Sequence, residues 1–187
     1  MALAASPAAA ATISYTLSGL FPSFYFNAAA PGDSGVLSGS TTLEELAPSF
    51  DASLGTLTGA TITETLGLSA GARWIPILKP GTSQIAIPPA VYVGLDVSSE
   101  IRAPLNVQLA SGKVVASPTI FYELDARGGQ TVTKTSAFSD ATALSAFLST
   151  SAPLTIVRAA DLHGYFTNVA SGSGGASAKY DTVITYT

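Results

Sequence analysis

Short runs in which apolar and polar residues alternate recur along this chain, and they constrain its fold more than any other feature. Residues 12–17 (TISYTL) and 57–66 (LTGATITETL) alternate with a period of two and are rich in Thr and Ile. Because successive side chains of a β-strand point to opposite faces, this pattern favours strands with one buried face. Further strands of the same kind are predicted at 73–78, 84–87, 90–97, 105–109, 119–124, 130–134, 154–157, 165–169 and 182–187.

Turn-forming residues divide these runs at short intervals. The strongest breakers are residues 31–33 (PGD), 110–112 (ASG), 127–129 (RGG) and the run 171–175 (SGSGG), which is predicted as a flexible loop. Many short strands with a turn signal about every 8–12 residues are typical of a β-sandwich or barrel. We therefore predict an all-β fold, an antiparallel, jelly-roll-like β-sandwich, and a single domain that spans residues 12–187.

Helical patterns are scarce. One short helix is predicted near residues 139–148, where Ser139 would cap the N-terminus and Leu144 and Phe147 would belong to an apolar stripe. A weaker helical turn is predicted at residues 42–46. A parallel sheet would need a helix of about 10–15 residues between successive strands, so this scarcity favours an antiparallel fold.

The composition indicates a surface that is covered by small polar side chains. Charged residues make up 11% of the chain, against about 25% in an ordinary soluble domain. Ser, Thr, Gly and Ala supply much of the remainder. Because interspersed charge normally keeps cytosolic proteins apart, a surface of hydroxyls and backbone is expected of an exported protein that packs against copies of itself.

Charge and cysteine content exclude several classes of function. The net charge is −4, and the eight basic residues are scattered singly. A nucleic-acid surface needs clustered Lys and Arg to neutralise phosphates, so nucleic acid is not an expected partner. The chain has no cysteine, which excludes disulfides, thiolate metal sites and cysteine nucleophiles.

The first residues of the chain, MALAASPAAAA, are rich in alanine and offer small-residue cleavage positions at their end. We interpret residues 1–11 as the remnant of an export signal, with a flexible leader as the alternative, because a full signal also carries a basic segment and a longer apolar run. No stretch approaches the roughly 20 apolar residues of a transmembrane helix, so no membrane span is expected. The expected location is therefore secreted, extracellular or at the cell surface.

Candidate catalytic residues are few. His163 is the single histidine, and Asp161 would lie on the same side of a strand, but a hydrolase also needs an activated serine and no G-x-S-x-G motif occurs. We interpret His163 as a turn residue. Glu44 and Glu45 are adjacent and diverge, so they cannot flank one glycosidic bond. No catalytic residue is predicted, and the protein is not expected to be an enzyme.

Metal and cofactor motifs are also missing from the sequence. Asp96 and Glu100 lie close together at the end of a predicted strand and could offer oxygen ligands to calcium. A solvated turn is the favoured interpretation, because no D-x-D-x-D-G loop is present. The glycines of residues 171–175 are not followed by the Lys-Ser/Thr pair and helix of a phosphate-binding loop. No metal and no cofactor are predicted.

Aromatic rings are densest at residues 21–26. Core packing is the favoured role for these rings, and a carbohydrate platform or a partner-binding strand is the alternative. Residues 12–17 and 20–26 also lack the charges that usually guard a strand edge, although both segments could instead pair within one sandwich. The candidate subunit interface consists of Ile13, Tyr15, Leu17, Phe21, Phe24, Tyr25 and Phe26. The candidate glycan contacts are exposed rings at Trp74 and Tyr92.

Residues 46–62 (LAPSFDASLGTLTGATI) resemble the P-x-F-D-x-S-L-G-T-L segment of bacterial choice-of-anchor domains, particularly anchor type E. The closing residues 180–187 (YDTVITYT) are similar to the alternating Tyr/Thr strand that ends such domains. The resemblance implies an exported β-sandwich, often with a C-terminal PEP-CTERM sorting tail, and it implies no catalytic residues. No sorting tail follows Thr187, which we interpret as a trimmed tail or as a free, assembling relative.

The same motif has a physical interpretation. Phe50 and Asp51 are expected to lead into a turn in which Asp51 bonds the backbone near Ser53. Gly55 is expected to adopt a positive φ before a strand that starts at Thr56.

These features predict an exported structural or adhesive protein of a bacterial surface or extracellular matrix. One specific version is a filament subunit that assembles by strand addition through residues 12–28. The alternative is a secreted carbohydrate-binding module that uses exposed rings. The expected partners are copies of the chain or other surface components, and polysaccharide under the alternative.

Overall fold

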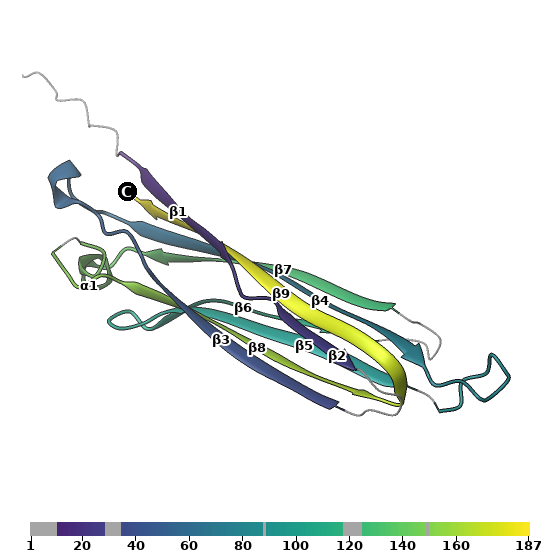
Figure 1. Ribbon diagram of the computed structural model, residues 1–187. Helices are drawn as coiled ribbons and strands as arrows, with labels where there is room; N and C mark the ends of the chain where they lie inside the picture. Colours follow the sequence, from purple (N-terminus) through teal and green to yellow (C-terminus); the bar gives the residue numbers. More distant parts are fainter. Residues whose placement is uncertain (1–10, 29–34, 88, 118–124, 149) are drawn as a thin grey trace, which may run out of the picture.

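The computed structural model describes residues 11–28, 35–87, 89–117, 125–148 and 150–187. Two antiparallel β-sheets lie face to face along a common long axis, and the short helix lies at the end that carries the C-terminus (Figure 1). The predicted all-β sandwich is therefore confirmed. Its elements are β1 (Ile13–Leu20), β2 (Phe24–Ala28), β3 (Gly35–Leu46), η1 (Ala52–Leu54), β4 (Ala60–Pro76), β5 (Ala90–Ile101), β6 (Val107–Ala116), β7 (Asp125–Phe138), α1 (Ala141–Ser145), β8 (Thr155–Thr167) and β9 (Val169–Tyr186).

The strand order is that of a jelly roll. Sheet A has the order β1-β9-β4-β7, with β2 also paired to β9, and sheet B has the order β3-β8-β5-β6. Because β1 and β2 pair with successive stretches of β9, they form one edge strand that is broken at residues 21–23. With these two counted as one, the chain passes back and forth between the sheets in the manner of a double Greek key.

Alternation along the strands builds the core between the sheets. β4 turns Ile62, Leu66 and Leu68 inward, where each is almost completely buried. The buried side chains form two clusters, one that includes Leu66 and Leu95 and one that includes Ile62 and Phe147. Burial of apolar area contributes roughly 25 cal/mol per Å², so these two clusters supply the main stabilisation of the sandwich.

The outer face of sheet A carries hydroxyl groups where a cytosolic protein would carry charges. Hydroxyls on neighbouring strands hydrogen-bond one another, and such cross-strand pairs stabilise a sheet by roughly 0.2–1 kcal/mol each. This face agrees with the composition, which predicts a surface of small polar side chains. The pairs are Ser14–Thr185 (3.0 Å), Thr63–Thr135 (2.9 Å), Thr65–Thr133 (3.1 Å) and Ser69–Ser177 (3.0 Å).

Three glycine-containing segments that the sequence predicts as turns or loops lie inside strands instead. At Gly128 a Cβ atom would lie 2.2 Å from the carbonyl oxygen of Val115, and at Gly174 it would lie 2.3 Å from the Phe26 ring. These glycines therefore permit close approach within and between the sheets, a use of glycine that resembles a turn signal in sequence. The segments are 110–112 in β6, 127–129 in β7 and 171–175 in β9.

Several predicted strands differ in length from the observed ones. The runs 57–66 and 73–78 belong to one strand, β4, which starts at Ala60 rather than Thr56. The run 84–87 contributes only an isolated bridge at Ile85. The predicted strand at 119–124, the turn at 31–33 and most of the leader at 1–11 lie outside the described residues.

The short helix α1 confirms the helix predicted near residues 139–148. Its N-cap is Asp140 rather than Ser139, because the Asp140 carboxylate accepts a hydrogen bond from the Ala143 amide at 2.8 Å. The helical turn predicted at residues 42–46 is wrong. Those residues end β3, where pairing with β8 outweighs their local helical preference.

The turn at Phe50 and Asp51 matches its predicted geometry. Phe50 is 6% exposed, and its ring packs edge-on against Tyr186. The Asp51 carboxylate accepts a hydrogen bond from the Ser53 amide at 2.9 Å, which lowers the pKa of Asp51. Gly55 follows with a φ of 139°. Burial also raises the pKa of Tyr186 to about 12, consistent with its place in the core.

We expect Phe50→Ala to lower the free energy of unfolding by about 3–5 kcal/mol, because it leaves a cavity beside Tyr186. Leu54 belongs to the same turn and is 60% exposed, so Leu54→Ala is a matched control that should change the free energy of unfolding by less than about 0.5 kcal/mol. Chemical denaturation measures both. Equal effects of the two substitutions would show that Phe50 does not anchor the turn.

A buried ionic network joins the two sheets. Arg158 of β8 is fully buried, and its Nε donates to Glu64 Oε1 of β4 at 2.8 Å while its Nη1 donates to Glu45 Oε2 of β3 at 3.1 Å. Thr182 of β9 accepts from Arg158 and donates to Glu64. The guanidinium carbon lies 3.8 Å from the centre of the Tyr180 ring. The sequence analysis missed this network, although Glu64 and Arg158 stand in the inward phase of alternating strands.

Removing one partner of the network should be far more damaging than replacing both. We expect Arg158→Met to lower the free energy of unfolding by about 3–5 kcal/mol, since it leaves the Glu64 carboxylate buried without a counter-ion. The double variant Glu64→Leu/Arg158→Met should recover most of that loss, because apolar replacements of buried ion pairs are often neutral. Urea unfolding of both variants tests this, and a double variant as unstable as Arg158→Met would contradict it.

Candidate functional site

β1 and β2 form an outer edge of sheet A, and they carry the predicted subunit-interface residues. Most of these side chains turn inward. Ile13, Tyr15, Leu17, Phe24 and Phe26 are partly buried against the core, and Phe21 lies within it at 3% exposure. Only the Tyr25 side chain projects outward, and it is 82% exposed.

Because β1 and β2 pair with β9 of their own sandwich, residues 12–28 do not form a free donor strand. Phe21 is unavailable to another subunit because its side chain is buried in the core, so that part of the predicted interface is wrong. The surface that β1 and β2 present sideways is their outer row of backbone N–H and C=O groups. An edge of this kind can pair with a strand of another chain.

The two long sides of the sandwich differ in how their edges are covered. On one side, β6 and β7 close over each other: the Lys113 amide donates to Gln130 Oε1 at 2.9 Å, and Lys134 Nζ donates to the Gln108 carbonyl at 2.8 Å. On the other side lie the edges of β1, β2 and β3. β1 and β2 contain no charged residue, and β3 contains charge only at Glu44 and Glu45 near its end.

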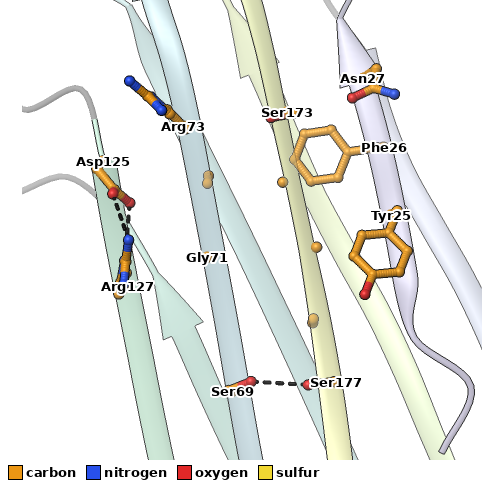
Figure 2. Close-up of a pocket in the computed structure, with 14 residues that line it drawn as sticks. Tyr25, Phe26, Asn27, Ser69, Gly71, Arg73, Asp125, Arg127, Ser173 and Ser177 are labelled. Atoms are coloured by element: carbon orange, nitrogen blue, oxygen red, sulfur yellow. Dashed lines mark hydrogen bonds and ion pairs between the residues drawn. The ribbon is translucent and has the colours of Figure 1, made fainter.

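A trough crosses the outer face of sheet A beside β2 (Figure 2). Its position follows from the strand register, which aligns Tyr25, Gly175, Gly71 and Arg127 in one row across four strands. The two central members of this row lack side chains, so the surface is hollowed between Tyr25 and Arg127. The hollow has a volume of about 690 Å³, and Ser69, Ser173 and Ser177 add hydroxyl groups to its lining.

The far wall of the trough is basic. Arg127 forms an ion pair with Asp125 at 3.0 Å, and this hydrogen-bonded contact lowers the pKa of Asp125. Arg73 lies opposite Asp125 in the register of β4 and β7. Among the described residues Arg73 has no ion pair, although its charge also acts on Asp125.

A second polar and aromatic cluster lies on the outer face of sheet B. Tyr92 of β5 and Tyr165 of β8 are stacked with ring centres 5.7 Å apart. The Tyr92 hydroxyl lies 3.2 Å from His163 Nε2, and His163 Nδ1 lies 3.7 Å from Asp96 Oδ2. His163 is therefore a strand residue of β8 rather than the predicted turn residue, and its acidic neighbour is Asp96 rather than Asp161.

The described contacts of this cluster are those of a polar surface group. Asp96 also faces Lys113 Nζ at 3.5 Å, so its carboxylate already has two cationic or polar neighbours. The described residues place no serine in hydrogen-bond contact with His163. Among them there is also no group of three or more His, Asp or Glu side chains arranged to hold a metal ion.

The two predicted glycan contacts differ in their exposure. Trp74 is 2% exposed and lies in the core, so its prediction as an exposed ring is wrong. Its inward place follows from the same β4 alternation that buries Ala70 and Ala72. Tyr92 does reach the surface in its stack with Tyr165, which is 45% exposed.

The sequence analysis missed Arg73, Arg127 and Gly71 as parts of one surface. The signal was present in β4, where Ser69, Gly71 and Arg73 share the outward phase of an alternating strand. Their alignment with Tyr25 depends on the pairing of β2 with β9, which a sequence pattern does not specify.

Comparisons with known proteins leave the family open. No family model matches the chain, and no curated protein matches it. A structure of infectious bursal disease virus, Gx strain, covers the whole chain at 10% identity with a TM-score of 0.25, and the chain spans 42% of that protein. A cowpea mosaic virus empty particle has a TM-score of 0.22 at 10% identity, with 94% of this chain and 83% of that one covered. A Bacillus endospore appendage, described as a disulfide-linked pilus, has a TM-score of 0.15 at 8% identity, with coverages of 86% and 95%.

Similarities at this level carry no argument about function, so the function has to be inferred from the surfaces of the molecule itself. Among the described residues, no helix has the length and apolar character needed to cross a membrane.

Proposed function

We propose that this protein is an exported structural β-sandwich that associates with copies of itself, or with other surface components, through the outer edge of β1 and β2. The observation that carries the proposal is that the two long sides of the sandwich differ in how their strand edges are covered. Lys113, Lys134 and Gln130 close the edges of β6 and β7, whereas β1 and β2 present an uncharged edge.

Exposed edges are normally guarded by charge, proline or bulges, because they template pairing with other chains. In this edge the single interruption of pairing is the break at residues 21–23, which contains Pro22. The stretch of β1 on its N-terminal side has eight residues in continuous register with β9. This length suffices for pairing with a neighbouring strand, since strands of globular proteins average about 5–6 residues.

Export and a place at a bacterial surface belong to the same proposal. The low charge, the hydroxyl-covered face of sheet A and the resemblance of residues 46–62 to choice-of-anchor domains support it. Jelly rolls also occur in both structural shells and lectins, so the fold alone does not choose a function.

Carbohydrate binding is the second candidate function. The observation that favours it is a pair of exposed rings, Tyr25 and Tyr165, that each stand beside polar side chains on a sheet face. Sugar rings pack on such aromatic faces while their hydroxyls bond polar neighbours.

The edge proposal predicts that a single charge on β1 blocks association. Thr16 is exposed on β1, and we expect Thr16→Lys to convert the associated wild-type protein into a monomer. Thr131 is an equally exposed threonine of β7 on the closed side, so Thr131→Lys should leave the mass unchanged. Light scattering at high protein concentration gives the masses. A wild-type protein that is already monomeric there would end the proposal.

We also propose that the protein is not an enzyme. Purified protein should show no turnover on panels of ester, glycoside and peptide substrates, because among the described residues His163 is hydrogen-bonded to the Tyr92 hydroxyl and no serine is bonded to it. Turnover that is lost in both His163→Ala and His163→Gln would point to a catalytic acid or base at His163 and would require a new function.

A further inference from the structure

The trough on the outer face of sheet A has the chemistry of a binding site that the proposed association does not use. We propose that it binds an acidic saccharide, a segment of a polysaccharide chain that carries uronate carboxylates. Tyr25 supplies a face for a sugar ring, and Arg73 receives a carboxylate. The proposal does not depend on self-association, because the trough lies on the sheet face and not along the strand edge.

The aromatic wall is the first observation. Tyr25 is 82% exposed on β2 and stands at one side of the trough (Figure 2), and a Cβ atom added at Gly175 would lie 3.0 Å from Tyr25 Cδ1. A large ring held in this position leaves one face open above the trough. Exposed rings next to polar groups mark interaction sites, and pyranose rings pack against aromatic faces.

The second observation concerns the floor of the trough, where Gly71 and Gly175 carry no side chains. A Cβ atom added at Gly71 would meet nothing closer than the Ala126 carbonyl oxygen at 3.6 Å, which is ordinary contact. Gly71 also has no positive φ. Neither packing nor backbone conformation therefore requires glycine at this position of a central strand, where glycine is destabilising relative to alanine. Its consequence at the surface is to keep the trough open.

Charge selects the class of ligand. The trough contains the cations Arg73 and Arg127 and the single carboxylate Asp125, and Asp125 is paired with Arg127. Among the described residues Arg73 therefore forms no ion pair of its own, on a chain whose net charge is −4. A guanidinium binds carboxylates through two parallel hydrogen bonds, so an acidic ligand fits the site better than a neutral one. Two arginines are too few for the clustered phosphate contacts of nucleic acid.

The size and lining of the trough suit a few sugar units of a saccharide chain. The hollow of about 690 Å³ lies within the range of roughly 300–1,000 Å³ that ligand sites occupy. Its hydroxyl lining, with Ser69 bonded to Ser177 at 3.0 Å and Ser173 beside Asn27, offers donors and acceptors for sugar hydroxyls.

The test uses affinity electrophoresis and calorimetry with polygalacturonate as the acidic probe, and with dextran and a poly-glutamate peptide as comparison ligands. Wild-type protein should bind polygalacturonate at low salt and bind dextran and poly-glutamate at least tenfold more weakly. Gly71→Val fills the floor and should weaken binding at least tenfold, as should Arg73→Gln and Tyr25→Ala. Gly129→Val is the matched control, because Gly129 is equally open, with its nearest contact at 3.8 Å, and lies outside the trough.

Thermal melting checks that each variant is folded, and the measurement is repeated with monomeric Thr16→Lys protein so that association cannot change the result. Absence of polygalacturonate binding in the wild type would overturn the proposal. Unchanged binding in Gly71→Val, equal binding of poly-glutamate, or a loss of binding with Tyr92→Ala instead of Tyr25→Ala would each overturn it too. A wild-type monomer that still binds polygalacturonate through the trough would end the edge proposal and leave this one standing.

Discussion

The buried ion pair between Arg158 and Glu64 places a stricter requirement on its surroundings than any other contact described between the two sheets. Each sheet contributes one charge to the centre of an otherwise apolar interface, and neither charge has access to water. Taking two ions out of water is costly, so the pair needs further hydrogen bonds to compensate for the lost hydration. Glu45 and Thr182 accept such bonds from the Arg158 guanidinium. The network therefore joins β3, β4, β8 and β9 across the two sheets.

The same network divides the interior. One hydrophobic cluster surrounds Leu66 and Phe166, and the other surrounds Ile62 and Tyr186. Glu64 stands between Ile62 and Leu66 on β4, at the boundary of the two clusters. Three of the few charged residues of the chain, Glu45, Glu64 and Arg158, belong to this network. The β1/β2 edge carries no charge, and the outer face of sheet A carries many hydroxyl groups.

The fold class could be read from the sequence because alternation is a local property. Residues 13–20 and 60–66 show which side of a strand is buried, and the structure follows that pattern. The Phe50 turn was equally local, since Asp51 bonds an amide two residues away. Glycines in β6, β7 and β9 were misread as breaks, because the reason for them is a neighbouring strand or ring. The trough and the buried ion pair depend on register between distant strands, and no local pattern encodes that register.

The place of β9 in sheet A has a consequence for how the chain acquires its structure. β9 pairs with β1, β2 and β4, and it follows all of them in sequence. Sheet A therefore cannot be completed until the residues of β9 have been synthesised. Until then β1, β2 and β4 lack the strand with which each of them pairs. Folds ruled by such distant contacts form slowly. The sandwich of this chain is therefore completed late, when β9 joins β1, β2 and β4.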